Sequence, residues 1–274
     1  MVTSLSLLTR LENLEIGFMS PLSRPDRRSR RPPLTCTLLP VLTALRFQGV
    51  SEYLEDLVAQ IDAPLLGRFD ITFSHQLIFD TPQTTQFISR TPKFKARAAE
   101  AHMSFSNWQV QVVLSRGSFD RTLEFAISCR KSDWQLSFLA QVHNSLNCLV
   151  SFFPQALIPA VEFLYIETGF PGLNWQDDVE NSQWLEVLQS FTGVKELNVS
   201  LEFGPYIVPV LKKLVEEGST EVLLPALRIL FLEEPLPSGP VKEIIEQFVA
   251  ARQLADHPIT LSIWNSKFFV VRSA

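Results

Sequence analysis

The stretch LLPALRILFLEE, residues 223–234, decides the fold of this chain. It contains the pattern P-x-Φ-x-x-Φ-x-Φ, in which Φ is apolar, as PALRILFL beginning at Pro225. One residue separates the last two Φ positions, so on an extended strand their side chains point to the same side and can be buried together. A preceding proline is typical of a turn. The stretch therefore predicts a short buried strand around residue 230.

The same pattern recurs along the chain. PVLTALRF begins at Pro40, PLLGRFDI at Pro64 and PAVEFLYI at Pro159, while TRLENLEI at Thr9 and TGVKELNV at Thr192 lack only the proline. The last three copies begin at residues 159, 192 and 225, a constant step of 33 residues. A fixed period of this length is typical of solenoid proteins.

Amphipathic helices are expected between these strands. Apolar residues recur at i, i+3, i+4 and i+7 in YLEDLVAQI (53–61), SQWLEVLQSF (182–191), PYIVPVLKKLVEEG (205–218) and SGPVKEIIEQFVAARQ (238–253). Alternating strands and helices predict an α/β fold with a parallel sheet and helices on one side. At this period we expect a leucine-rich-repeat solenoid, a horseshoe with the sheet on its concave face and helices on its convex face. It would form a single domain over residues 1–274.

The middle of the chain departs from this pattern, and we expect an irregular section over residues 74–130. TPQTTQFISRTP (81–92) is typical of a short helix, because proline suits a first turn and a second proline stops it. AEAHMSF, WQVQVVLS and RTLEFAISC are typical of strands, and the last two could form a hairpin across SRGSFD (115–120). SDWQLSFLAQVHNSLNCLVSFF (132–153) is typical of a long helix.

An arginine- and proline-rich segment is expected to form a flexible loop at residues 20–34. Its basic residues are Arg24, Arg27, Arg28, Arg30 and Arg31. Two interpretations stay open: an irregular surface insertion, or a nuclear-localisation or anion-binding patch. The loop has no interleaved aromatic residues, which disfavours single-stranded nucleic acid as a partner.

The sequence contains no recognisable catalytic or cofactor motif. Its four histidines have no partner at a metal-ligand spacing, and GxSxG, P-loop and GxGxxG patterns are absent. The formal net charge of −5 gives no general attraction to nucleic acid or membranes, and no stretch is typical of a signal peptide or membrane span. We therefore expect a non-enzyme without a cofactor or metal, with no membrane partner, in the cytoplasm or nucleus.

A binding surface is expected on the concave face of the sheet, where residues between buried Φ positions point outward. The candidate protein-binding residues on this face are Arg46, Asp70, Phe163, Tyr165, Asn198, Ile229 and Phe231. Exposed aromatic residues on a rigid scaffold are common anchors of protein interfaces. The alternative is that flanking loops or the C-terminal segment cover them.

LTRLENLEIGFMSP, FISRTPKFKA and LPALRILFLEEPLPSGPVKEIIEQFVAARQL together resemble the leucine-rich-repeat region of F-box-type proteins of mushroom-forming (basidiomycete) fungi. The resemblance covers nearly the full length. In that family an F-box module docks a Skp1-like adaptor of a cullin ubiquitin ligase, and the repeats hold the substrate. The resemblance therefore implies a substrate-recognition role.

The F-box itself is missing, because no LP-x-E-[IL] helical opening precedes the first strand pattern. We expect a fragment or the repeat half of a longer protein, and a Skp1-like adaptor as partner only if an upstream F-box exists. The leading hypothesis is a protein-binding scaffold for an unknown protein substrate. The alternative is a binder of nucleic acid or an anionic ligand through the arginine-rich loop.

Overall fold

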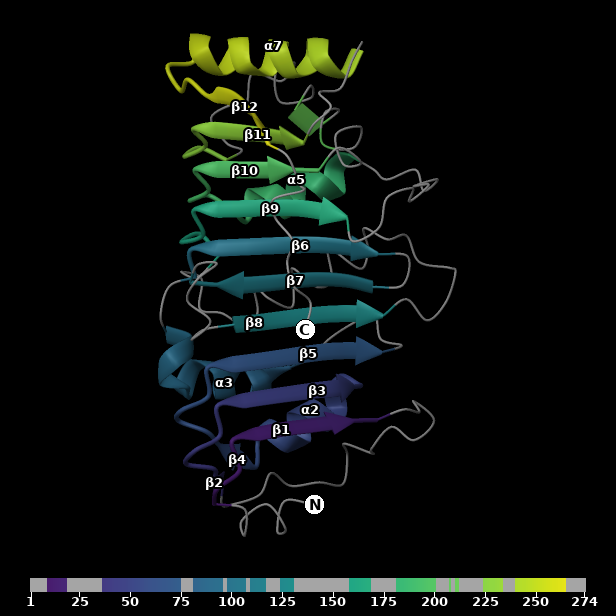
Figure 1. The fold of residues 1–274 in the computed structure, drawn as a ribbon, viewed down its shortest axis with the longest axis vertical. Coiled ribbons are helices and arrows are strands. Elements are labelled where there is room, and N and C mark those ends of the chain that lie inside the picture. Colours follow the sequence, from purple (N-terminus) through teal and green to yellow (C-terminus); the bar gives the residue numbers. More distant parts are fainter. Residues whose placement is uncertain are drawn as a thin grey trace.

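The computed structural model describes residues 9–18, 36–74, 81–95, 98–106, 109–116, 124–130, 158–168, 181–200, 207, 210–211, 224–233 and 240–264. These residues form a mixed α/β fold built around one long sheet (Figure 1). The basic loop expected at residues 20–34 and the helix expected at residues 132–153 lie outside the described residues.

The main sheet has ten strands in the spatial order β1-β3-β5-β8-β7-β6-β9-β10-β11-β12. These strands are β1 (Asn13–Gly17), β3 (Ala44–Gly49), β5 (Arg68–Ser74), β6 (Glu100–Ser106), β7 (Gln109–Ser115), β8 (Glu124–Arg130), β9 (Phe163–Thr168), β10 (Glu196–Val199), β11 (Ile229–Glu233) and β12 (Thr260–Trp264). A second sheet consists of two short parallel strands, β2 (Thr37–Leu38) and β4 (Ile61–Asp62). No sequence pattern above predicted β2, β4 or β12.

One arrangement of backbone hydrogen bonds repeats at the start of five of the parallel strand pairs. The Lys195 carbonyl accepts the N–H groups of Arg228 and Ile229 at 2.8 and 3.0 Å. The same arrangement, one carbonyl accepting two N–H groups from the following parallel strand, occurs at the carbonyls of Glu12, Thr43, Ala99 and Glu162. This shared bond sets the register of β9, β10 and β11, in which Phe163, Glu196 and Ile229 lie side by side.

The Φ positions of the repeated pattern form the core. In five copies all three Φ side chains are at most 6% exposed: Leu42, Leu45 and Phe47; Leu66, Phe69 and Ile71; Val161, Leu164 and Ile166; Val194, Leu197 and Val199; Leu227, Leu230 and Leu232. A fourth buried position, which the sequence pattern did not include, lies three residues before the first Φ: Leu39, Ala63, Ile158, Phe191 and Leu224. In each copy its carbonyl accepts the N–H of that first Φ residue, which closes the turn.

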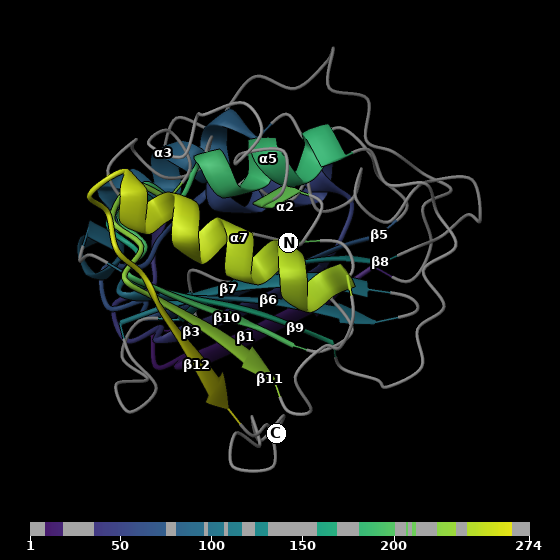
Figure 2. The same ribbon diagram turned by 90° about the horizontal axis from the view of Figure 1, so that it is seen from above.

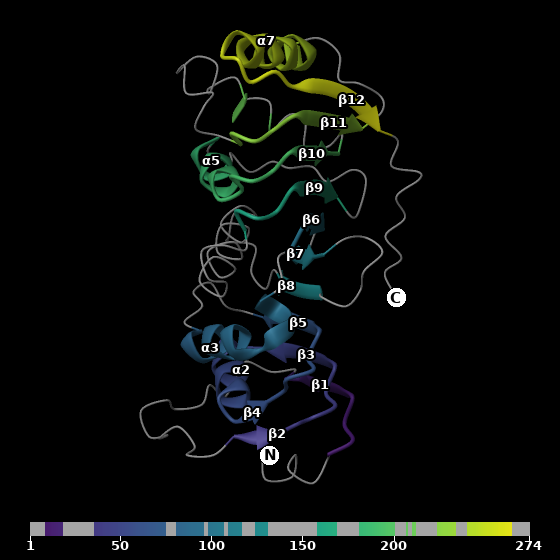
Figure 3. The ribbon, with the colours of Figure 1, turned by 90° about the vertical axis from the view of Figure 1, so that its left-hand side faces the viewer.

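The helices cover one face of the sheet. Helices α2 (Ser51–Val58), α3 (Pro82–Arg90) and α5 (Asn181–Gln189) lie along the same side, and α7 (Pro240–Leu254) lies at the β12 end (Figures 2 and 3). A 3-10 turn, η2 (Pro92–Lys95), follows α3. Within the described ranges no helix lies on the other face of the sheet, which we call the open face.

The middle of the sheet contains a reversed strand. β7 pairs antiparallel with both β6 and β8, whereas β8 pairs parallel with β5 and β6 pairs parallel with β9. The antiparallel hairpin predicted across SRGSFD is present as the β7–β8 pair. After β5 the chain leaves room for two strands in the sheet and forms β6 beyond them. It then folds back through β7, so that β8 takes the position next to β5.

Two charged side chains tie α2 to α3. The buried Glu55 carboxylate of α2 accepts the backbone N–H groups of Gln83 and Thr84 at 2.8 Å each, and the Thr84 hydroxyl at 2.6 Å. It thereby satisfies free donors in the first turn of α3. At the other end of α3, Arg90 Nη2 donates to the carbonyls of Val58, at 2.9 Å, and Ile61. Neighbouring helices are thus linked by charge-assisted bonds at both ends of α3.

Gly193 lies where two neighbouring turns approach each other closely. A Cβ atom at this position would lie 2.0 Å from the Pro159 carbonyl oxygen. We predict that Gly193→Ala lowers the free energy of unfolding by about 1–3 kcal/mol, because the turns would have to separate. Urea denaturation measures this loss. Gly17→Ala is the control, since nothing lies within 4 Å of a Cβ atom there; equal stability of the two variants would contradict the prediction.

Glu55→Gln tests the tie between α2 and α3. The substitution keeps the side-chain volume but removes the charge and one acceptor oxygen from a buried three-donor site. We predict a loss of about 1–3 kcal/mol in the free energy of unfolding, measured by urea denaturation. Glu243→Gln in the exposed first turn of α7 serves as the matched control, with a change below about 0.5 kcal/mol. A stability loss no larger than that of the control would rule out the proposed role of Glu55.

Candidate protein-binding face

The open face carries one continuous row of residues that are paired in register across all ten strands. In spatial order the row is Glu15, Arg46, Asp70, Ala126, Val113, His102, Tyr165, Asn198, Phe231 and Ser262. Five of the predicted residues belong to it, and Phe163 and Ile229 lie in the neighbouring row with Glu196 between them. Strands β8, β7 and β6 separate Asp70 from Tyr165. The predicted residues therefore form two groups rather than one patch.

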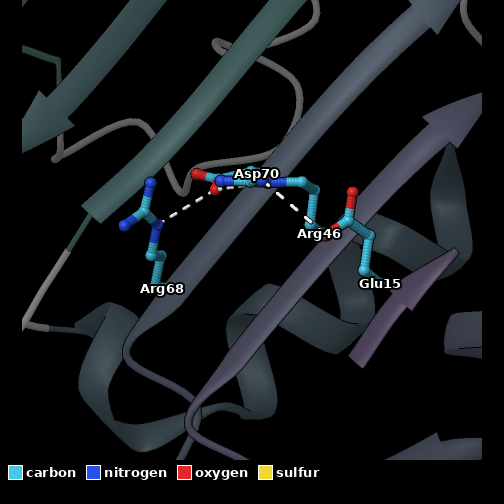
Figure 4. A network of polar contacts seen from close by, with 4 residues as sticks. All are labelled: Glu15, Arg46, Arg68 and Asp70. Carbon is cyan, nitrogen blue, oxygen red and sulfur yellow. Dashed lines mark hydrogen bonds and ion pairs between the residues drawn. The ribbon is translucent and has the colours of Figure 1, made fainter. Parts of the chain in front are cut away.

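The first group is an ionic network on β1, β3 and β5 (Figure 4). Asp70 Oδ2 lies 3.0 Å from Arg68 Nε and 3.4 Å from Arg46 Nε, while Arg46 Nη1 lies 3.7 Å from Glu15 Oε2. The two arginine side chains are nearly half exposed, at 43% and 49%. Exposed ion pairs contribute about 0–1 kcal/mol each. These charges are balanced within the network, so it offers a partner little net attraction.

The second group centres on a stacked pair of rings. The rings of His102 on β6 and Tyr165 on β9 lie 4.2 Å apart between centroids and only 5° from parallel. His102 Nδ1 lies 3.3 Å from Glu167 Oε1, and His102 Nε2 lies 3.7 Å from Glu100 Oε2. Glu196, beside Phe163 in register, brings a third carboxylate to the same region. We call His102, Tyr165, Glu100, Glu167 and Glu196 the acidic aromatic cluster.

The electrostatic character of the cluster is visible at Tyr165. Burial raises the pKa of the Tyr165 phenol to about 12, and the carboxylates of Glu100, Glu196 and Glu167 act in the same direction. A phenolate would be poorly solvated here and would lie among negative charges. The hydroxyl group therefore stays protonated at neutral pH.

Asn198 differs from its expected exposure. It lies on the open face as predicted from its position, but it is only 7% exposed. In register it lies between Tyr165 and Phe231, whose larger side chains shield it. Ser200, which follows on the same strand side, is 5% exposed, and its hydroxyl oxygen has no hydrogen-bond partner.

The apolar members of the predicted face are also less exposed than expected. Phe163, Tyr165, Ile229 and Phe231 are all partly buried rather than exposed. Neighbouring strands lie about 4.8 Å apart, so large side chains in adjacent rows shield one another. The arginines of the predicted basic loop, Arg24, Arg27, Arg28, Arg30 and Arg31, fall outside the described residues.

Sequence reasoning missed three members of the acidic aromatic cluster. His102 was treated as an isolated histidine, and Glu100 and Glu167 were not singled out. The alternation in AEAHMSF places Glu100 and His102 on one strand face. However, their meeting with Glu167 depends on β6 lying against β9, which no local pattern reveals because β7 and β8 intervene in the sequence.

Other potential sites are few in the described part of the chain. A groove of about 530 Å³ lies where β10, β11 and β12 begin, and Lys195, Arg228, Asp256 and His257 supply its charged and titratable lining. Among the residues that the structure describes, no group of three or more His, Cys, Asp or Glu side chains is placed to hold a metal ion. The described helices also include none with the length and apolar character needed to cross a membrane.

Comparison with known proteins adds no assignment: the chain matches no protein-family model, no curated protein and no solved structure. The open face must therefore be interpreted from its own geometry and chemistry.

Tyr165→Phe tests the environment of the cluster through pH. The folded protein holds the phenol proton to about pH 12, whereas the unfolded chain releases it near the ordinary pKa of 10.0. The stability contributed by the protonated phenol is fully present below pH 10.0 and is lost as the pH rises toward 12. We predict that the free energy of unfolding falls less steeply across this window in Tyr165→Phe than in the wild type.

Urea denaturation at a series of pH values measures these slopes. Tyr53→Phe, on helix α2, controls for the loss of a tyrosine hydroxyl elsewhere. Identical slopes for Tyr165→Phe and the wild type would show that the Tyr165 phenol is not perturbed.

Proposed function

We propose that this chain is a non-catalytic protein-binding scaffold of the leucine-rich-repeat solenoid class, with the open face of its sheet as the docking surface. The observation that carries this proposal is the in-register alignment of Tyr165, Asn198 and Phe231 on three adjacent parallel strands. Aromatic side chains on a sheet lose little conformational freedom on binding and form effective interface anchors. The described helices lie on the other face, so they do not compete for this surface.

The partner class follows from the sequence resemblance. We propose that the scaffold is the substrate-recognition part of an F-box-type ubiquitin ligase receptor, acting in the cytoplasm or nucleus on an unknown protein substrate. A Skp1-like adaptor would join through an F-box in a longer protein and not through the residues of this sheet.

The alternative function, binding of nucleic acid or an anionic ligand through Arg24, Arg27, Arg28, Arg30 and Arg31, has less support. The best-defined polar group on the open face contains three carboxylates, from Glu100, Glu167 and Glu196, which would repel phosphate. The charged network around Asp70 is internally paired and adds no excess of positive charge. These features favour a polypeptide partner over a polyanion.

The double variant Tyr165→Ala/Phe231→Ala tests the proposed docking surface. Immobilised wild-type protein is used to capture partners from an extract of cells that express this chain. The captured partners are identified and purified, and their affinities for the wild type and for the double variant are then measured directly. We predict at least about a tenfold loss of affinity, because aromatic anchors often contribute 1–2 kcal/mol or more each. Affinity that depends on aromatic anchors also changes little with salt concentration. The affinity for a partner that binds through its phosphates falls steeply as the salt concentration rises.

Leu254→Ala provides the matched control. Leu254 is 91% exposed and lies at the end of α7, away from the open face. Circular dichroism and urea denaturation establish that each variant is folded. Partners that bind the double variant as tightly as they bind the wild type would refute the open face as the docking surface.

A further inference from the structure

The groove of about 530 Å³ at the starts of β10, β11 and β12 adjoins the open face. Ligand-binding clefts usually have volumes of about 300–1,000 Å³. Ile229 and Thr260 line the groove, and they are paired in register in the same row as Phe163 of the open face. A polypeptide that docks on the open face can therefore extend into the groove.

Backbone hydrogen bonds hold three of the lining residues in line. The Arg228 N–H donates to the Lys195 carbonyl at 2.8 Å, and the Thr260 N–H donates to the Arg228 carbonyl at 2.7 Å. These residues lie at the starts of three adjacent strands and all line the groove. The sheet sets their positions, and sites built on strands are more precise than sites on loops.

The buried Arg252 side chain joins the two turns beside these strands. Its Nη2 donates to the carbonyls of Leu224 and Leu227 at 3.5 and 3.2 Å, in the turn before β11. Its own carbonyl accepts the N–H of His257, before β12, at 3.0 Å. Leu227 and His257 both line the groove, so one residue holds its two sides together.

Leu224 has an uncommon backbone conformation beside the groove. Its φ is 48°, and Asp256, with a φ of 60°, is the other non-glycine residue with positive φ among the described residues. Asp256 follows α7, where a left-handed residue commonly ends a helix, but a bulky residue such as leucine is rarely left-handed. In the other copies of the repeat no positive φ occurs at the equivalent residues, Leu39, Ala63, Ile158 and Phe191. Such outliers gather at functional sites, so this turn indicates a site at the groove.

The charges of the groove are mixed. Arg228 is exposed, and no acidic side chain in the described ranges forms an ion pair with it. Lys195 Nζ, in contrast, lies 2.7 Å from Glu162 Oε1. Asp256 adds a carboxylate to the lining. One guanidinium group is therefore available to an anion, and the nearby carboxylates favour a ligand with a single negative charge over a polyanion.

Apolar residues flank Arg228 in the groove. They are Pro225, Ala226, Leu227 and Pro258. A small inorganic anion would leave this apolar surface without contacts, whereas the residues on either side of an acid in a polypeptide would cover it. The lining therefore favours an acidic polypeptide segment with apolar neighbours.

We propose that this groove binds an aspartate or glutamate side chain of a partner polypeptide, with Arg228 as the residue that receives the carboxylate. Guanidinium and carboxylate groups are both planar and can form two parallel charge-assisted hydrogen bonds. This assignment rests on the proposed function, because the ligand belongs to a protein partner. It uses residues other than Tyr165 and Phe231, so the two proposals can be tested separately.

Fluorescence anisotropy with labelled, amide-terminated peptides tests the assignment on the full chain. PLELP is the probe, PLQLP lacks the charge, and PSESP lacks the apolar neighbours. We expect PLELP to bind most tightly and PSESP more weakly. PLQLP should bind at least about tenfold more weakly than PLELP, because it cannot form the charge-assisted pair.

Arg228→Gln should weaken PLELP binding by about tenfold and change PLQLP binding by less than about twofold. Arg10→Gln is the matched control, since Arg10 is exposed, lies ahead of β1 at the other end of the sheet and carries the same charge. Because salt screens distant charges, it should leave PLELP binding within about twofold of the wild type. Circular dichroism establishes that both variants are folded.

Three outcomes would overturn the proposal. Equal weakening of PLELP binding by Arg228→Gln and Arg10→Gln would mean general attraction between opposite charges. Failure of PLELP to bind the wild type would remove the site. Tighter binding of a peptide with phosphoserine in place of the glutamate would mean that the groove recognises phosphate instead.

The scaffold proposal and the carboxylate-site proposal fail in different ways. A captured partner whose affinity depends on Tyr165 and Phe231 but not on Arg228 would retain the docking surface and remove the carboxylate site. Specific PLELP binding, combined with captured partners that are indifferent to Tyr165 and Phe231, would retain the carboxylate site and remove the wider docking surface.

Discussion

The backbone carbonyl that accepts two N–H groups from the following parallel strand is the constraint on which the rest of the structure depends. At Lys195 these bonds join β10 to β11, and the equivalent carbonyls lie ahead of four other strands. They fix the register of the parallel strands that they join. A slip of one residue would move every buried Φ side chain to the open face. The core and the open-face rows are therefore two consequences of one hydrogen-bonding pattern.

The two faces of the sheet are stabilised in different ways. On the helix side, apolar rows are buried and the helices are joined by charged groups such as Glu55, whose hydrogen-bonding capacity is satisfied by α3. On the open face, the ionic network around Asp70 joins neighbouring strands instead. Each side also keeps a buried polar atom without a hydrogen-bond partner, Arg90 Nε on the helix side and Ser200 Oγ on the open face, and such atoms reduce stability.

Sequence reasoning located strands and helices where the local pattern was strong. The period-two Φ positions identified β9, β10 and β11, and the spacing of apolar residues identified α2 and α7, because these signals depend only on nearby residues. It missed β12 and the contact of His102 with Glu167, which depends on pairing between distant segments. It also overestimated the exposure of Asn198, since shielding by Tyr165 and Phe231 appears only when strands lie side by side.

The reversed strand β7 has a consequence for how the chain reaches this arrangement. The parallel contacts on either side of the inserted meander join residues far apart in sequence, such as Arg68 with Glu124 and Glu100 with Phe163. Closing such long loops is slow relative to forming a hairpin. We therefore expect the β6–β7–β8 meander, whose strands are joined by the shortest connections of the middle, to form before the two parallel contacts that flank it.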